Sequence, residues 1–166
     1  MDYPNWYRNV SAPFRAAGAR RALDALDRGL VILIAIGYVA VLVWLAIAGD
    51  ARFWKALLVP AATFALVTVV RQALDRPRPY ALYDIDPILV KERQGKSFPS
   101  RHVSSAVIIA CALLWVNVAW GAPALVACGV VSMTRIIGGV HFPRDVIAAI
   151  AIAAACAVVG FILIPS

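Results

Sequence analysis

Long runs of apolar residues alternate along this chain with short polar connections. A helix that crosses a membrane needs about 20 consecutive apolar residues, and lengths of roughly 17–25 are tolerated. The runs that come close to this length cover residues 29–48, 54–70, 103–119, 122–137 and 146–164. Inside lipid the backbone polar groups have no water to bind, so such runs must pair these groups internally as helices. The pattern therefore predicts five transmembrane helices.

The pattern leaves the helix boundaries less obvious in two places. Residues 103–134 carry no charge and are too many for one helix, and the Trp-Gly-Ala-Pro sequence at 120–123 favours a turn there. Residues 16–30 combine apolar and charged side chains at helical spacing, which predicts a separate helix lying at the membrane interface. The chain would then divide into an N-terminal interfacial segment, 1–28, and a transmembrane domain, 29–166.

The overall composition agrees with a membrane protein. Hydrophobic residues make up 63% of the 166 residues and charged residues 15%, with a mean hydropathy of +0.82. Ordinary soluble domains have about 45–50% apolar and about 25% charged residues. The composition thus excludes a water-soluble enzyme, a disordered tail and a disulfide-rich scaffold. The predicted fold class is an all-α, polytopic membrane helix bundle, with about five transmembrane helices and an N-terminal interfacial helix.

Charge is concentrated at one side of the predicted bundle. The chain carries 16 Lys and Arg against 9 Asp and Glu, a net charge of +7. The N-terminus and the connections after the second and fourth helices share one side, and among the Lys and Arg only Arg52 and Lys55 lie on the other. Because cytoplasmic loops are enriched in Lys and Arg, this distribution favours the cytoplasm for the charged side. Basic residues confined to loops do not suit nucleic acid, so membrane lipids and a lipid phosphate are the expected partners.

The charged side also holds the residue types that bind and transfer phosphate. Both histidines of the chain lie there, together with several arginines, whose planar guanidinium groups match phosphate oxygens. One serine is placed to cap the third helix, where free backbone N–H groups and the helix dipole favour an anion. The residues that we expect to bind phosphate are Arg71, Arg78, Ser100, Arg101 and Arg135.

The two histidines and one aspartate are arranged as a catalytic group. His141 and Asp145 lie four residues apart, so the carboxylate can reach and orient the imidazole. This spacing favours a mechanism in which His141 attacks phosphorus and forms a phosphohistidine, while His102 protonates the departing oxygen. The arginines would neutralise the charge that develops on the phosphate oxygens. The sequence offers no carboxylate cluster suited to Mg²⁺, so we expect no metal and no other cofactor.

Three short motifs connect these residues to a known family. The chain resembles the type-2 phosphatidic acid phosphatase family, whose signature is K-x6-R-P, P-S-G-H and S-R-x5-H-x3-D. The corresponding sequences here are Arg71-x6-Arg78-Pro79, Pro99-Ser100-Arg101-His102 and Thr134-Arg135-x5-His141-x3-Asp145. Arginine thus replaces the usual lysine at 71 and the usual glycine at 101. The resemblance extends over about residues 67–150, and family members usually have six transmembrane helices, one more than predicted here.

The resemblance implies a role for each motif residue and an activity for the whole. It implies that His141 is the nucleophile, Asp145 its partner and His102 the acid, with the remaining motif residues as phosphate ligands. The implied activity is metal-independent removal of phosphate from a lipid phosphate or diphosphate, such as phosphatidic acid, phosphatidylglycerol phosphate or a polyprenyl phosphate. Many bacterial members act on the outer leaflet, in contrast to the side that the charges favour. A protein that binds or transports phospholipids without cleaving them is the alternative, and the oligomeric state stays open.

Overall fold

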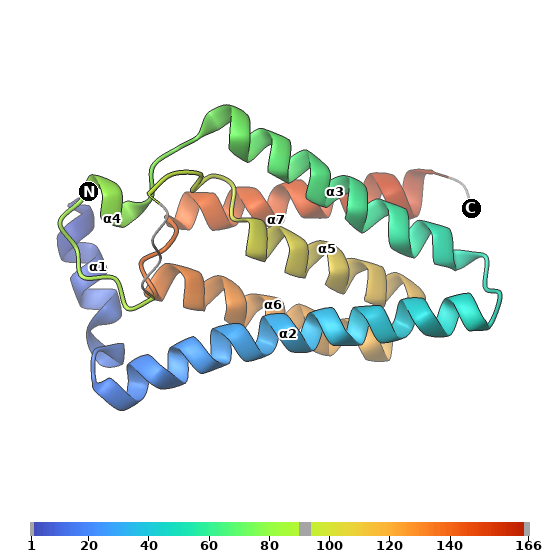
Figure 1. The fold of residues 1–166 in the computed structure, drawn as a ribbon, viewed down its shortest axis with the longest axis horizontal. Coiled ribbons are helices and arrows are strands. Elements are labelled where there is room, and N and C mark those ends of the chain that lie inside the picture. Colours follow the sequence, from blue (N-terminus) through green and yellow to red (C-terminus); the bar gives the residue numbers. More distant parts are fainter. Residues whose placement is uncertain (1, 90–93, 165–166) are drawn as a thin grey trace.

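The structure of the chain, a computed structural model, describes residues 2–89 and 94–164. Within these residues every regular element is helical, which confirms the predicted all-α class (Figure 1). In chain order the elements are α1 (Tyr3–Ser11), the 3-10 turn η1 (Ala12–Phe14), α2 (Ala17–Ile47), α3 (Arg52–Leu74), α4 (Pro79–Leu82), α5 (Arg101–Val116), α6 (Val118–Ile137), α7 (Pro143–Ala157) and the π-helical turn η2 (Val158–Leu163). The ends of the two predicted segments, residues 1 and 165–166, lie outside the described residues.

Five of these helices run lengthwise and form a bundle. α5 lies in the middle and packs against α2, α3, α6 and α7 (Figure 1). Among the described residues, four helices are long and apolar enough to cross a membrane, and they begin at Ala17, Arg52, Val118 and Pro143. α5 is a shorter apolar helix of 16 residues. Each of the five predicted transmembrane segments therefore overlaps a helix of the bundle.

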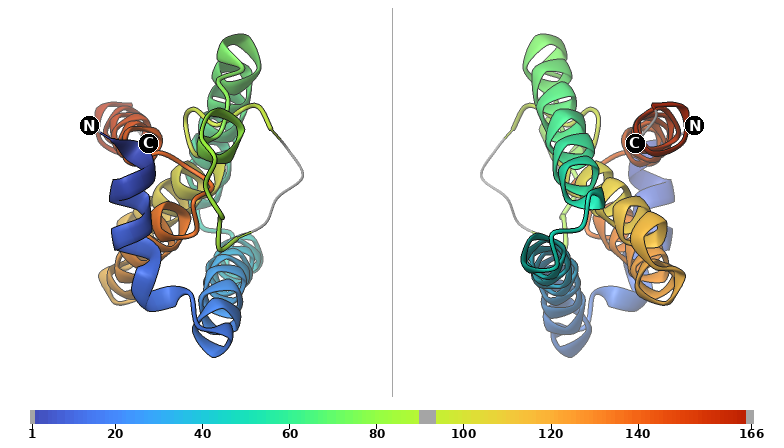
Figure 2. Two further views of the ribbon diagram at one scale, coloured as in Figure 1. Left: turned by 90° about the vertical axis from the view of Figure 1, so that its left-hand side faces the viewer. Right: turned by 90° about the vertical axis from the view of Figure 1, so that its right-hand side faces the viewer.

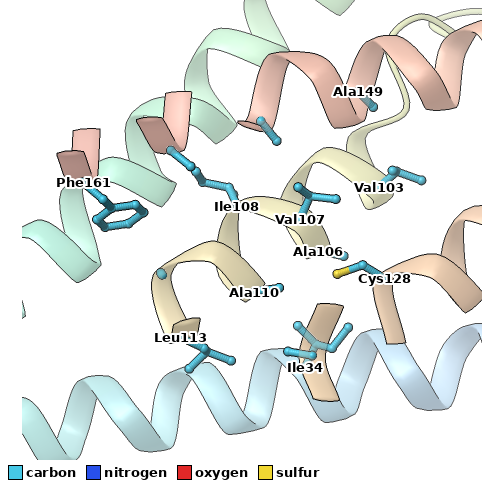
Figure 3. Packing of buried hydrophobic residues seen from close by; sticks show 14 of the residues in the cluster. Ile34, Val103, Ala106, Val107, Ile108, Ala110, Leu113, Cys128, Ala149 and Phe161 are labelled. Carbon is cyan, nitrogen blue, oxygen red and sulfur yellow. The ribbon is translucent and has the colours of Figure 1, made fainter. Parts of the chain in front are cut away.

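The core of the bundle is built around α5. Val103 and Ala110 of this helix are completely buried, and Ile108 is nearly so (Figure 3). Ala149 of α7 and Cys128 of α6 pack in the same cluster. Small side chains let helix backbones approach closely, which favours helix association within lipid. The outer faces of the bundle, by contrast, expose many large apolar side chains, as a lipid-facing surface does.

The turn between α5 and α6 lies at Asn117, so the turn predicted at 120–123 is wrong. The Asn117 side chain accepts a hydrogen bond of 2.8 Å from the backbone N–H of Ala119 and thereby caps α6. Residues 120–123 belong to the first turns of α6 instead. Gly121 serves helix packing there, because a Cβ at this position would lie 2.2 Å from Leu114 Cα of α5.

The α2 helix is continuous from Ala17 to Ile47. The predicted N-terminal helix is present as α1, but residues 17–30 do not form a separate helix and belong to the first half of α2. A single glycine in a helix costs only about 1 kcal/mol, so Gly29 does not interrupt it. At about 1.5 Å per residue the helix is about 46 Å long, which exceeds the roughly 30 Å of a hydrocarbon core. The charged first half of α2 can thus extend beyond the lipid tails.

The α1 helix lies crosswise over one end of the bundle (Figures 1 and 2). The Tyr7 hydroxyl donates a hydrogen bond to the Ile137 carbonyl of α6 and accepts one from the Ile88 backbone N–H, both at 3.2 Å. The Tyr3 ring packs on Phe142 with 4.8 Å between ring centroids. α1 therefore joins the α3–α5 connection, the end of α6 and the start of α7.

Candidate active site

The predicted catalytic residues gather at the end of the bundle that α1 covers. The α3–α5 connection and the α6–α7 turn meet there (Figure 2). His141 lies in the α6–α7 turn, is 2% exposed, and donates its backbone N–H to the Arg135 carbonyl at 3.3 Å. The chain reverses through Gly139, whose φ of 73° is strained for other residues. A Cβ at Gly139 would also lie 2.6 Å from the Tyr7 hydroxyl, so α1 and this turn fit closely together.

His141, Ser97 and Asp145 form a continuous series of buried polar contacts. Asp145 Oδ2 lies 3.7 Å from His141 Nδ1, which is longer than a hydrogen bond. Ser97 Oγ donates to Asp145 Oδ2 at 2.6 Å and lies 3.4 Å from His141 Nδ1. Asp145 Oδ2 also accepts the Phe142 backbone N–H at 3.2 Å, which fixes the carboxylate. The predicted approach of Asp145 to His141 is therefore found, but the hydrogen bonds run through Ser97.

Burial controls the charge of His141. It lowers the pKa of the imidazole from its usual 6.5 to about 4. The carboxylate of Asp145 opposes this change, whereas the cationic Arg78 and Arg71 lower the pKa further. The imidazole is thus neutral at physiological pH, as a nitrogen nucleophile must be. Because the charges of both arginines act on His141, the first motif lies close to the third.

The two arginines of the first motif are buried and held by backbone carbonyls. Arg71 lies in the last turn of α3, where its guanidinium donates to the Pro99 carbonyl and lies 3.4 Å from the Ser97 carbonyl. Arg78 is the N-cap residue of α4, and its Nε donates to the Gly95 carbonyl at 3.3 Å. These carbonyl partners are uncharged, and they orient both guanidinium groups at this end of the bundle.

The second motif forms the start of α5. Ser100 takes the N-cap position, and its backbone N–H donates to the Asp145 carbonyl at 3.1 Å. Its side chain makes no capping hydrogen bond, so that part of the sequence-based prediction is wrong. The backbone link to Asp145 holds Ser100 against α7, and its buried Oγ has no hydrogen-bond partner among the described residues. This hydroxyl is available to an anion.

A groove of about 300 Å³ between α2, α3 and α5 leads along the second motif. Arg101 and His102 line one part of it, and the remaining walls, which include Ile34, Phe64 and Ile109, are mainly apolar. The Arg101 guanidinium lies over the Phe64 ring, 5.7 Å from its centroid. The groove therefore combines one cationic group, Arg101, with mainly apolar walls.

Arg135 of the third motif is paired with an aspartate from another helix. It is 3% exposed, and its Nη2 lies 2.8 Å from Oδ2 of Asp27 in α2. The other oxygen of Asp27, Oδ1, accepts the Thr134 hydroxyl at 2.8 Å. Arg135 Nε is buried and has no hydrogen-bond partner within the described part of the chain. Arg78 lies close enough for its charge to act on Arg135.

Ser97 and Asp27 were not identified by the sequence-based prediction. Ser97 lies two residues before Pro99, and a serine in a loop carries no distinctive signal. Asp27 did offer a signal, because an acid at the start of an apolar run usually needs a partner. In the described residues no group of three or more His, Cys, Asp or Glu is placed to hold a metal ion.

Comparisons with known proteins agree with this fold and these motifs. Residues 52–165 match the model of the PAP2 superfamily. The fold is similar to the crystal structure of Aquifex aeolicus LpxE, with a TM-score of 0.74 and 22% identity over 94% of this chain and 92% of that chain. It is also similar to the crystal structure of a transmembrane PAP2 type phosphatidylglycerolphosphate phosphatase from Bacillus subtilis, with a TM-score of 0.51 and 22% identity over 91% and 88% of the two chains. No curated protein sequence matches the chain. Since the family model covers more than half of the chain and all three motifs, this protein belongs to the PAP2 superfamily.

Proposed function

We propose that this chain removes phosphate from a lipid phosphate or diphosphate by transferring it to His141. Membership of the PAP2 superfamily makes the chain a membrane lipid phosphatase, and its apolar helices agree with that location. The observation that carries the proposed mechanism is the buried series of contacts from His141 through Ser97 to Asp145. It supports a neutral, oriented imidazole as the nucleophile.

The contacts of Ser97 favour attack by Nε2 of His141. The Ser97 hydroxyl donates to Asp145, so its oxygen is free to accept the Nδ1–H of the imidazole. The proton on Nδ1 leaves the lone pair on Nε2. Attack of Nε2 on phosphorus forms a P–N bond and breaks the P–O bond to the leaving group, which is the lipid alcohol of a monophosphate or the lipid phosphate of a diphosphate. Asp145 stabilises the resulting positive imidazole through Ser97.

The cationic and hydroxyl groups around His141 would bind the phosphate oxygens. Arg71, Arg78 and the partner-free Ser100 hydroxyl supply donors, and Arg135 adds its buried Nε–H. His102 would protonate the departing lipid oxygen and then take a proton from the water that attacks the phosphohistidine. Release of inorganic phosphate returns His141 to its neutral form.

The groove beside the second motif supports a lipid as the substrate. Its apolar walls suit a hydrocarbon chain, while Arg101 suits a second anionic group next to the scissile phosphate. Phosphatidic acid, phosphatidylglycerol phosphate and polyprenyl phosphates or diphosphates are the candidate substrates. The Bacillus subtilis relative is itself described as a phosphatidylglycerolphosphate phosphatase.

The N-terminal arginines support a cytoplasmic location for the site. Residues 2–28 contain Arg8, Arg15, Arg20, Arg21 and Arg28, none of which belongs to the three motifs. A membrane-impermeant maleimide should label an Arg8→Cys variant only after the cells are broken, since Arg8 is exposed. Labelling in intact cells would place the site on the outer side.

Phosphate release by the purified protein tests the proposed function. The assay uses detergent-solubilised protein, a panel of lipid phosphates and diphosphates, and EDTA throughout. We expect His141→Ala to abolish release and Arg28→Gln, a change at an exposed arginine of the same bundle end, to preserve it. His102→Ala should accumulate an acid-labile phosphoenzyme from ³²P-labelled diphosphate. Lipid binding without release would favour a binding or transport protein, and strict dependence on Mg²⁺ would exclude the mechanism.

A further inference from the structure

Asp27 is a buried carboxylate in α2, a helix whose side chains are mostly exposed or half-buried. Only four residues of α2 are buried, and Asp27, at 2% exposure, is the only charged one. A charge within a membrane-spanning helix is costly to bury and is usually retained because it pairs with a functional group. The partner here is Arg135, an arginine of the third motif.

Both oxygens of Asp27 are used at this contact. Oδ2 lies 2.8 Å from Arg135 Nη2, and Oδ1 accepts the Thr134 hydroxyl at 2.8 Å. The Thr134 hydrogen bond fixes the carboxylate, and the contact with Nη2 in turn restrains the Arg135 guanidinium. The Nε–H of Arg135 stays buried and without a partner in the described structure. Arg135 is therefore held on one edge and free on another.

We propose that Asp27 is a positioning residue for phosphate transfer, which acts by fixing the guanidinium of Arg135 against the site. This inference rests on the proposed function, because it assigns to Arg135 a bond to the phosphate oxygens. Asp27 lies in α2, outside residues 52–165 that match the PAP2 superfamily model. A helix outside the matched region, α2, thus contributes a side chain that contacts the third motif.

A substitution that keeps the shape of Asp27 but removes its charge distinguishes two roles: orientation of the Arg135 guanidinium, and a general effect of the negative charge on phosphate binding. Asp27→Asn removes the negative charge near the site, so attraction of inorganic phosphate should be unchanged or stronger. If Asp27 orients Arg135 for the transition state, however, kcat should fall about 10- to 100-fold, since loss of a whole transition-state donor costs about 10²- to 10³-fold. We expect KM and inhibition by inorganic phosphate to change less than about threefold. Asp27→Glu, which retains the carboxylate, should recover part of the lost kcat.

The matched control lies one helical turn away. Asp24 is on the same helix but half-exposed, and it forms an ion pair of 2.9 Å with the exposed Arg28. Asp24→Asn should keep kcat within about twofold of the unmodified protein, because exposed ion pairs contribute little. Asp27→Asn is also made in an Arg135→Ala background, where a residue that acts only through Arg135 should have no further effect on kcat.

The outcomes distinguish this inference from the proposed function. If the unmodified protein releases no phosphate from any lipid, the proposed function itself fails. If it does, and Asp27→Asn keeps kcat within twofold or lowers it equally with and without Arg135, Asp27 is not a positioning residue. Should Asp27→Asn fail to fold, Thr134→Val removes the hydrogen bond that fixes the Asp27 carboxylate, and an unchanged kcat in that variant would overturn the inference.

Discussion

The titration of His141 can be isolated from every other imidazole in the chain. The chain has only two histidines, so His102→Gln leaves His141 as the sole imidazole of the tag-free protein. Burial lowers its pKa from 6.5 to about 4. At about 1.4 kcal/mol for each pKa unit, the difference amounts to about 3 kcal/mol against the charged form. NMR of ¹⁵N-histidine-labelled protein in micelles should therefore detect a neutral imidazole, protonated on Nδ1, down to about pH 5.

The same difference makes the free energy of unfolding depend on pH. Above pH 6.5, His141 is neutral in both the folded and the unfolded chain and has no effect. Between 6.5 and about 4, the unfolded chain binds a proton that the folded chain does not, so stability falls as the pH falls. Below this window the full loss, about 3 kcal/mol, is reached. Thermal unfolding of His141→Gln should lack this part of the acid sensitivity.

Two results would refute this reasoning in different ways. A midpoint near 6.5 in the folded protein would mean that burial does not control the charge of His141. A low midpoint with the proton on Nε2 would keep the burial argument but contradict the role of Ser97, since that tautomer has no Nδ1–H to donate. The peptide spanning the α6–α7 turn provides the unburied reference.

Other measurements address separate features of the molecule. Ser97→Ala should lower kcat about 10- to 100-fold with little change in KM, because the imidazole loses its link to the carboxylate; unchanged kcat would exclude that link. Arg101→Gly should raise KM for a lipid diphosphate about tenfold and leave KM for a monophosphate nearly unchanged, and equal effects would exclude a second anion contact. Gly121→Val should reduce the free energy of unfolding by about 1–3 kcal/mol or more, whereas Gly129→Ala, where a Cβ meets nothing within 4 Å, should not. Phosphate release should persist after exhaustive EDTA treatment, and recovery only on adding Mg²⁺ would show that arginines do not replace a metal.

Much of the fold follows from hydropathy because lipid imposes one rule on the backbone. Each apolar run long enough to span had to become a helix, so the five segments and the end that carries the charges could be predicted. Boundaries were harder, since they depend on contacts between distant residues. The Gly121 and Pro123 pair favours a turn in isolation, but Gly121 meets Leu114 closely and Asn117 provides the actual cap. Pro123 costs α6 a single hydrogen bond near its start.

The candidate site, like the fold, could be predicted from the sequence only in part. His141, Asp145 and the arginines share one bundle end because their spacing along the chain is tied to helix ends. The 3.7 Å gap that Ser97 bridges, and the pairing of Arg135 with Asp27, depend on side-chain positions that spacing does not determine. Such distances are set only when the chain has folded.

The short length of α5 affects how a lipid reaches the site. Arg52 Nη1 donates to the Val116 carbonyl at 3.1 Å, so α3 begins level with the end of α5. α3 has 23 residues and α5 has 16, so at about 1.5 Å per residue α3 rises about 10 Å beyond the start of α5. α5 spans about 24 Å, less than the roughly 30 Å of a hydrocarbon core. The start of α5, where the second motif lies, is thus recessed relative to the end of α3, and we expect the bilayer to thin locally around the protein to match the short helix.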